Sequence, residues 1–205
     1  LTMQATRRPE APETRPTFIV DFAPAPQPGA DPLADFILPR SVQRRPLSRR
    51  PLTAAEKAAL AASLPPGIGV TWLEGRAKRA AAWLMYRNAK LRLTTPEALQ
   101  AHRAAIEWNA RYSEDRIPDQ ALGVDPVTAR LMRWVMADRR RVEFFNTWLA
   151  GTVVPRLQMD LLPGLACAAH FILTAERAPR RVDDYVAAGR AMQRFWLTAT
   201  AQRLQ

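Results

Sequence analysis

The order of apolar and polar residues along this chain, punctuated by helix caps and prolines, predicts a mostly helical protein. Thr53 and Glu56 form a capping box, and Asp125 followed by Pro126 gives a second helix start. Thr95 is expected to cap a further helix. The predicted helices cover residues 31–38, 53–64, 76–92, 96–111, 125–138 with an end or a bend at 139–141, 142–150 and 183–204.

Three shorter segments carry the β-branched and aromatic residues that are typical of strands. They are residues 17–22, residues 69–75 and the nearly continuous apolar run 165–175. We expect the last of these to be a buried strand centred on Phe171 that ends at Thr174. Long helices and few strands together predict an α+β fold, helix-dominated with a small central sheet.

Proline-rich residues separate the beginning of the chain from the rest. Residues 1–32 are predicted to be a connector with one strand, and residues 33–205 to be the folded domain. Hydrophobic residues make up 48% of the 205 positions, which is enough for a packed core.

The residues that the chain lacks limit its chemistry. Cys167 is the only cysteine, which excludes a disulfide framework and a cysteine zinc site, and two distant histidines supply a metal site poorly. No glycine-rich phosphate loop and no serine-nucleophile motif occurs. No apolar run is long enough for a membrane span, and the first residues lack the apolar core of a signal peptide. We therefore expect a soluble cytoplasmic protein.

Cys167 and His170 are the side chains of the apolar run that could do chemistry. Three residues apart in a strand, they would point to opposite faces, so a cysteine–histidine pair is not expected. Cys167 is then a small buried hydrophobe and His170 a hydrogen-bonded core histidine. The neighbouring acidic pairs of the chain are interpreted as turn and cap residues, so no catalytic residue is predicted.

The net charge of the chain is +11, and arginine provides most of its positive charges. Five arginines without an intervening acid lie close together, namely Arg40, Arg44, Arg45, Arg49 and Arg50. Such a run can be a nucleic-acid arm, a clamp for a phosphorylated ligand or a solvated surface. Ser41 could add a hydroxyl to a clamp, whereas no aromatic residue that would stack on bases lies in this stretch. The clamp is favoured over nucleic acid, and on the pattern alone a solvated surface is the simplest of the three.

The segment DFILPRSVQRRPLSRRPLTAAEKAALAASL resembles the opening of flavin-dependent nitroreductases. That family has a short helix, an R-[RH]-S-x-[RK] stretch and then an L-T-x-E helix, and its basic residues and serine hold the phosphate of FMN. The resemblance places this role on Arg40 and Ser41, and then on Arg44 or Arg45. One extra residue separates the serine from the next arginine in this chain.

The downstream half resembles a narrower group, the nitroreductase-like proteins fused to or encoded with ThiF-type activating domains, which are related to proteins with two half-domains. RVEFFNTWLAGTVVPRLQMDLLPGLACAAHFIL and DDYVAAGRAMQRFWLTAT are among the phrases that carry it. It implies the later part of a longer protein, working as a homodimer or with a preceding half-domain. Residues 142–150 and the helix with Phe195 and Trp196 are expected to expose apolar surface to a partner.

The same resemblance implies an oxidoreductase in which NAD(P)H passes two electrons through FMN to an electron-poor small molecule. On the last helix, Arg190, Gln193 and Arg194 are candidates for facing a cleft beside the cofactor, or else are solvent-facing residues. The family's flavin-ring loop, S-x-x-N-x-Q-P-W, is missing, and PPGIGVTWLEG stands in its place. A non-catalytic protein that binds or sequesters FMN is therefore the first alternative. A basic nucleic-acid-binding domain, recognisable by steep salt dependence, is the second.

Overall fold

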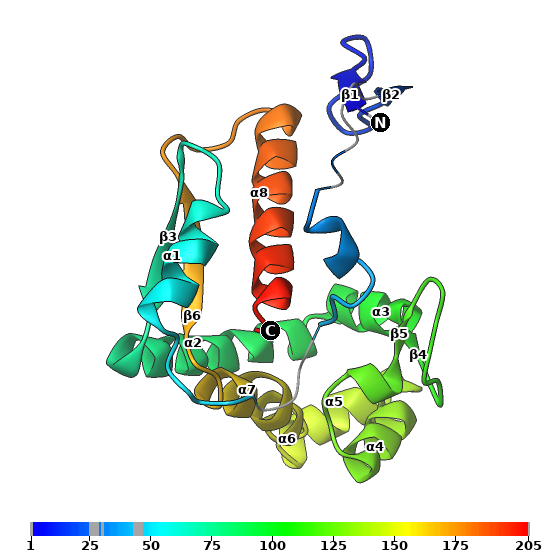
Figure 1. Cartoon of the computed structure of the whole chain (residues 1–205). Helices are drawn as coiled ribbons and strands as arrows, with labels where there is room; N and C mark the ends of the chain where they lie inside the picture. The colour runs from blue at the N-terminus through cyan, green and yellow to red at the C-terminus, as the bar shows by residue number, and fades with distance from the viewer. Residues whose placement is uncertain (1, 25–28, 30, 43–46, 205) are drawn as a thin grey trace. The chain divides into compact units, whose positions relative to one another are not determined.

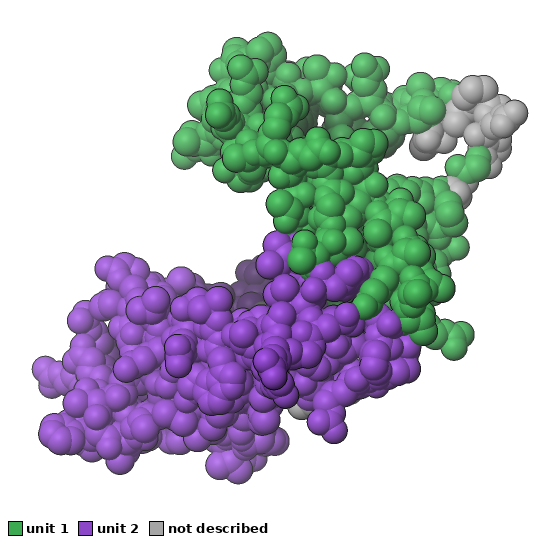
Figure 2. Space-filling model, turned by 90° about the vertical axis from the view of Figure 1, so that its left-hand side faces the viewer, with its two compact units in different colours: residues 1–41, 53–71, 173–205 green, residues 42–52, 72–172 purple. Residues whose placement is uncertain are grey.

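The computed structural model describes residues 2–24, 29, 31–42 and 47–204. The chain forms two compact units, which Figure 2 colours separately. Unit 1 consists of residues 1–41, 53–71 and 173–205, and unit 2 of residues 42–52 and 72–172. Each unit is therefore assembled from segments that are far apart in the sequence.

Unit 1 begins with an antiparallel hairpin of β1 (Thr2–Arg7) and β2 (Phe18–Ala23), in which Arg7 faces Phe18 at the loop end. The apolar and β-branched residues of β2 predicted this strand from the sequence. β1 has a mixed, polar composition without such a signal, and the structure adds it as a second strand in this region.

The helices of unit 1 are the short η1 (Ala34–Phe36), α1 (Ala54–Ala62) and the long α8 (Val182–Ala201), which packs against both of the others (Figure 1). The capping box predicted for α1 is confirmed. Glu56 N donates to Thr53 Oγ1 at 3.2 Å, and Thr53 N donates to the Glu56 carboxylate at 2.7 Å.

The core of unit 1 lies where α1 meets α8. Leu60 of α1 and Ala191, Phe195 and Leu197 of α8 each have at most 6% of their surface exposed. Ala191 and Phe195 are one helical turn apart, so both face the same neighbour. Burial of each large side chain in this group contributes about 1.5–3 kcal/mol to the stability of the unit.

Unit 2 is mainly helical. Its helices are α2 (Gly75–Thr94), α3 (Pro96–Ala105), α4 (Pro126–Met136) and α5 (Arg139–Trp148), followed by a continuous helical stretch of α6 (Val153–Arg156), the π-helical turn η3 (Leu157–Leu161) and α7 (Leu162–Leu165). Between α3 and α4 lie the short parallel strands β4 (Ile106–Glu107) and β5 (Ile117–Pro118) and the turn η2 (Asp119–Ala121).

The stretch from α6 to α7 packs along α2, and Gly164 and Ala82, two small residues, lie against each other there. A Cβ on Gly164 would lie 3.0 Å from Ala82 Cβ, so glycine is favoured at this position. The π-helical turn adjoins Pro163, which has no N–H to donate. In this turn Leu162 N donates to Leu157 O, five residues back.

Strands β3 (Ile68–Leu73) and β6 (His170–Ala175) form a pair of their own. The described strands therefore make three separate two-stranded sheets, and the prediction of one small central sheet is wrong. The mixed, helix-dominated class is confirmed. In the part of the chain that the structure describes, no helix has both the length and the apolar character needed to cross a membrane.

The apolar run 165–175 is a strand only in its second half. α7 ends at Leu165, residues 166–169 bend, and β6 starts at His170. Phe171, which was expected at a buried centre, has 37% of its surface exposed and contacts the ring of Trp72 edge-on at 6.2 Å. Apolar composition therefore predicted the strand but not its burial.

Three helix predictions also differ from the structure in detail. α3 ends at Ala105 rather than near residue 111, because the next residues pair with β5. Thr95 precedes α3, but its hydroxyl donates to Leu91 O at 2.7 Å rather than capping α3. Within residues 31–38, only the single 3-10 turn η1 is regular.

Candidate functional site

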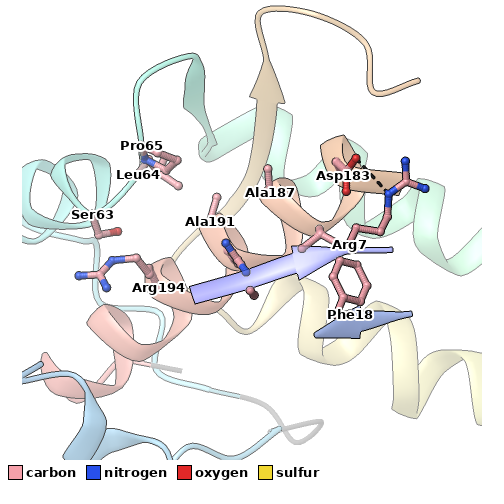
Figure 3. A pocket seen from close by; sticks show the side chains of 12 residues that line it. Arg7, Phe18, Ser63, Leu64, Pro65, Asp183, Ala187, Ala191 and Arg194 are labelled. Atoms are coloured by element: carbon pink, nitrogen blue, oxygen red, sulfur yellow. Dashed lines mark ion pairs between the residues drawn. The ribbon is translucent and has the colours of Figure 1, made fainter. Parts of the chain in front are cut away.

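Unit 1 contains a pocket of about 560 Å³ between the β1–β2 hairpin, the end of α1 and one face of α8 (Figure 3). This volume is within the range of small-molecule and cofactor sites. The lining combines apolar surface with three arginines and one aspartate. It consists of Ala5, Arg7, Phe18, Ser63, Leu64, Pro65, Asp183, Val186, Ala187, Arg190, Ala191 and Arg194.

The periodicity of α8 explains its share of the lining. Arg190 and Arg194 are four residues apart, so their side chains leave the helix on the same face. Ala187 and Ala191 lie on this face as well, and their small side chains leave space above the helix (Figure 3). The helical pattern thus brings two of the predicted cofactor residues into one hollow.

Arg7 ties the hairpin to the beginning of α8. Its Nη1 lies 3.2 Å from Glu13 Oε1 and its Nε lies 3.3 Å from Asp183 Oδ2, the ion pair drawn in Figure 3. Val182 N donates to the second oxygen of Glu13 at 3.1 Å. Only 21% of the Arg7 side chain is exposed, whereas Glu13 and Asp183 are more than half exposed, so solvent still screens the network in part. Arg7 and Asp183 are therefore engaged with each other rather than with a ligand.

Arg194 also has a carboxylate partner, whereas Arg190 has none among the described residues. Arg194 Nη1 donates to Asp31 Oδ2 at 2.7 Å, and this hydrogen bond holds the pKa of Asp31 below its usual value. The Arg190 side chain makes no hydrogen bond or ion pair within the described part of the chain. The guanidinium of Arg190 is thus the lining group whose donors remain for a ligand.

Arg40 lies on a different face of α8. Its guanidinium carbon is 4.1 Å from the ring centroid of Trp196, a cation–π contact. Trp196 follows Arg194 by two residues, which turns its side chain by about 200° around the helix. Arg40 Nε is buried and has no hydrogen-bond partner among the described residues. Arg40 is therefore near α8 but does not line the pocket.

Two further predicted cofactor residues, Ser41 and Gln193, lie outside the lining of the pocket. Gln193 is half-buried on α8. Arg44 and Arg45 lie outside the described residues. The two arginines of α8 are therefore the predicted residues that the pocket brings together.

A second cluster, in unit 2, corrects the interpretation of Cys167 and His170. Cys167 Sγ lies 3.9 Å from His170 Nε2, and both atoms contact Gly164 O, at 3.3 Å and 3.0 Å. The prediction of opposite strand faces is wrong, because residues 166–169 bend before β6 begins. Lys78 Nζ donates to Cys167 O at 2.7 Å and fixes the bend to α2. Cys167 is buried, as predicted, with 8% of its surface exposed.

No family model, curated protein or solved structure matches this chain. Among the described residues, no group of three or more histidine, cysteine, aspartate or glutamate side chains could hold a metal ion. The arrangement in unit 1 can bind an anionic group through Arg190 and an apolar body on the alanine face of α8.

Sequence reasoning missed Arg7 and Phe18 as part of this pocket. Arg7 lies in a proline-rich stretch about 180 residues before α8, and no local pattern indicates that the two meet. The four-residue spacing of Arg190 and Arg194 was visible in the sequence. Arg7 and Phe18 join them in the pocket only because the β1–β2 hairpin packs there, and no local sequence pattern predicts this packing.

Proposed function

We propose that this chain is part of an FMN-dependent oxidoreductase of nitroreductase type, which passes two electrons from NAD(P)H through FMN to an electron-poor small molecule. The pocket of unit 1 carries the proposal, because Arg190 offers a guanidinium without a described partner beside apolar surface. A phosphate group and a flat ring system need these two features. The redox role itself follows from the resemblance of residues 33–205 to nitroreductases.

The donor set of unit 1 suits a phosphate-bearing cofactor. Arginine can donate two parallel hydrogen bonds to phosphate oxygens. Phe18, Ala187 and Ala191 supply apolar surface on which a ring system could lie. The buried Nε of Arg40 is a second donor without a described partner, at a residue to which the family resemblance assigns phosphate binding. Bound FMN would supply the redox chemistry, and Arg190 with the apolar lining would hold and orient it, whereas Arg40, on another face of α8, is an alternative position for the phosphate.

The charges of the pocket favour modest affinity. Arg7 and Arg194 already pair with carboxylates, so a phosphate gains one charge-assisted contact, from Arg190. Such a contact contributes about 1.5–3 kcal/mol. We therefore expect this chain alone to bind FMN weakly, and a preceding half-domain or a second copy to complete the site.

A non-catalytic protein that binds or sequesters FMN is the second candidate, and the missing flavin-ring loop favours it. Both candidates bind the same cofactor, but only the oxidoreductase turns over. FMN-dependent oxidation of NAD(P)H in the presence of a quinone or nitroaromatic acceptor distinguishes them. FMN binding without such oxidation would favour the non-catalytic protein.

Arg190→Ala should weaken FMN binding by roughly ten- to a hundredfold while leaving riboflavin binding nearly unchanged, because riboflavin lacks the phosphate. Titrations followed by flavin fluorescence measure both affinities. Arg79→Ala is the matched control, since Arg79 is an exposed helix residue of α2 and its loss changes the net charge equally.

Arg40→Ala, measured in the same titrations, tests the second donor. A selective loss of FMN binding in Arg40→Ala but not in Arg190→Ala would move the phosphate site to Arg40. Equal losses of FMN and riboflavin in both variants would remove the phosphate assignment. Absence of FMN binding, together with nucleic-acid binding of steep salt dependence, would overturn the proposed function in favour of the nucleic-acid alternative.

A further inference from the structure

Helices α3, α4 and α5 of unit 2, with the residues around the start of α6, surround a second cavity of about 270 Å³. Its wall is almost wholly apolar, with Leu99 from α3, Leu131 and Val135 from α4, and Phe145 and Leu149 from α5. Protein interiors contain few voids larger than a water molecule. This space is partly open to solvent and can take up a small apolar molecule.

The polar side chains of the wall differ in what they already contact. Thr128 donates to the carboxylate that caps α4, and Asn146 Nδ2 donates to Leu93 O at 3.3 Å. His102 of α3 is half-buried, and its ring nitrogens make no hydrogen bond within the described part of the chain. The ring thus offers a hydrogen-bonding position at the edge of an apolar space.

The imidazole of His102 is uncharged at neutral pH. Burial lowers the pKa of His102 below its usual value, and the nearby charge of Arg92 lowers it further. A neutral imidazole has one nitrogen that donates and one that accepts. It can therefore meet either a hydroxyl or a carbonyl group of a ligand.

Size and charge narrow the class of ligand. An apolar cavity of about 150 Å³ holds one benzene molecule. The present cavity of about 270 Å³ is nearly twice as large, which matches two fused rings. Its wall contains no aspartate, glutamate, lysine or arginine among the described residues, so a charged ligand would lose its hydration without a counter-charge.

We propose that this cavity binds an uncharged bicyclic aromatic molecule whose single hydroxyl or carbonyl group contacts His102. Met132 and Met136 belong to the wall, and their flexible side chains can adapt to ligands of similar size and different outline. The site lies within unit 2 and does not depend on FMN binding in unit 1.

A pair of probes tests both the cavity and its polar end. Calorimetry or equilibrium dialysis of the full chain should show saturable one-to-one binding of 2-naphthol and of naphthalene. His102→Leu should weaken 2-naphthol binding about two- to tenfold, the effect of one neutral hydrogen bond, and leave naphthalene binding unchanged. Equal losses for the two probes would overturn the contact with His102.

Val135→Phe should abolish binding of both probes by placing a ring in the cavity. Val20→Phe is the control, because Val20 is 42% exposed on β2 and lies outside the cavity. Circular dichroism shows whether each variant is folded. Failure of the wild-type chain to bind either probe, or wild-type affinity in a folded Val135→Phe, would overturn the proposal. A change of oligomeric mass in Val135→Phe without a change in probe binding would overturn it too, and would assign the cavity to a second copy.

Discussion

At the scale of single residues, Cys167 and His170 are close enough to interact but are not arranged for nucleophilic catalysis. His170 Nε2 lies 3.0 Å from Gly164 O, so this nitrogen carries the proton and cannot accept one from the thiol. Burial raises the pKa of Cys167, although the charge of Lys78 opposes this. The sulfur therefore stays a protonated thiol at neutral pH.

We predict that Cys167 reacts with a thiol reagent many-fold more slowly in the native protein than in denaturant. Only 8% of the residue is exposed, and the thiolate that reacts is scarce while the pKa is raised. Colour-forming disulfide reagents measure the rate in both states. Rapid reaction of the native thiol would contradict the burial of this bend.

The sequence could not predict this pair, because its prediction assumed an uninterrupted strand. Residues 166–169 form a bend instead of a strand. The bend brings the side chains of Cys167 and His170 to the carbonyl oxygen of Gly164. Pro163 and Gly164 lie upstream inside α7, and no glycine or proline within residues 165–175 marks the bend in the sequence.

At the scale of elements, the starts of α1 and α4 were predicted correctly because their caps are local. Asp125 is an example, since its carboxylate accepts from Val127 N at 2.9 Å and from Thr128 N at 3.0 Å. Gln158 Nε2 also donates to it, at 2.7 Å, which links the start of α4 to η3. These hydrogen bonds, first those from Thr128, hold the pKa of Asp125 far below its usual value.

Asp125→Ala should lower the midpoint of thermal unfolding at neutral pH, and the difference from wild type should vanish in acid. The pKa of Asp125 is lower in the folded than in the unfolded chain. Its stabilisation is therefore fully present above the unfolded value of about 4 and is lost as pH falls toward the folded value. Melting curves between neutral pH and acid check this. Asp115→Ala is the control, since 82% of the Asp115 side chain is exposed, and equal effects of the two variants would contradict the cap assignment.

Strand pairing was predicted less well, because the partners of a strand are not local. β3 and β6 are separated by about 100 residues, and the sequence of neither strand identifies the other as its pairing partner. The same limit applies to the pocket of unit 1. The spacing of Arg190 and Arg194 could be recognised in the sequence of α8. That Arg7 lines the same pocket could not, because it depends on how the β1–β2 hairpin packs.

At the scale of the whole molecule, only one of the two aromatic segments that were expected to face a partner exposes its aromatic side chains. Phe195 is 2% exposed in the core of unit 1, and Trp196 is covered by Arg40, so this part of the expected partner surface is wrong. On α4 and α5 of unit 2, by contrast, Trp134, Phe144 and Trp148 are 51%, 52% and 75% exposed. Exposed apolar groups of this kind usually mark a surface for another protein or another copy.

We predict that the 205-residue chain self-associates through this aromatic surface. Light scattering coupled to size exclusion should give a mass that rises with concentration, and Trp148→Glu should reduce that rise. Tyr112→Glu is the control, because Tyr112 is 77% exposed in the loop between β4 and β5 and belongs to neither α4 nor α5. A monomer at all concentrations, or the same effect from both substitutions, would contradict the prediction.

The division of the chain into interleaved segments has a consequence for how the protein is made. α1 leaves the ribosome about 120 residues before α8, the helix that buries its Leu60. At roughly 5–20 residues per second, α1 waits on the order of 6–24 s for that partner. During this interval the apolar side of α1 is exposed to chaperones and proteases. Translation speed over residues 63–181 therefore sets how long the nascent chain is vulnerable.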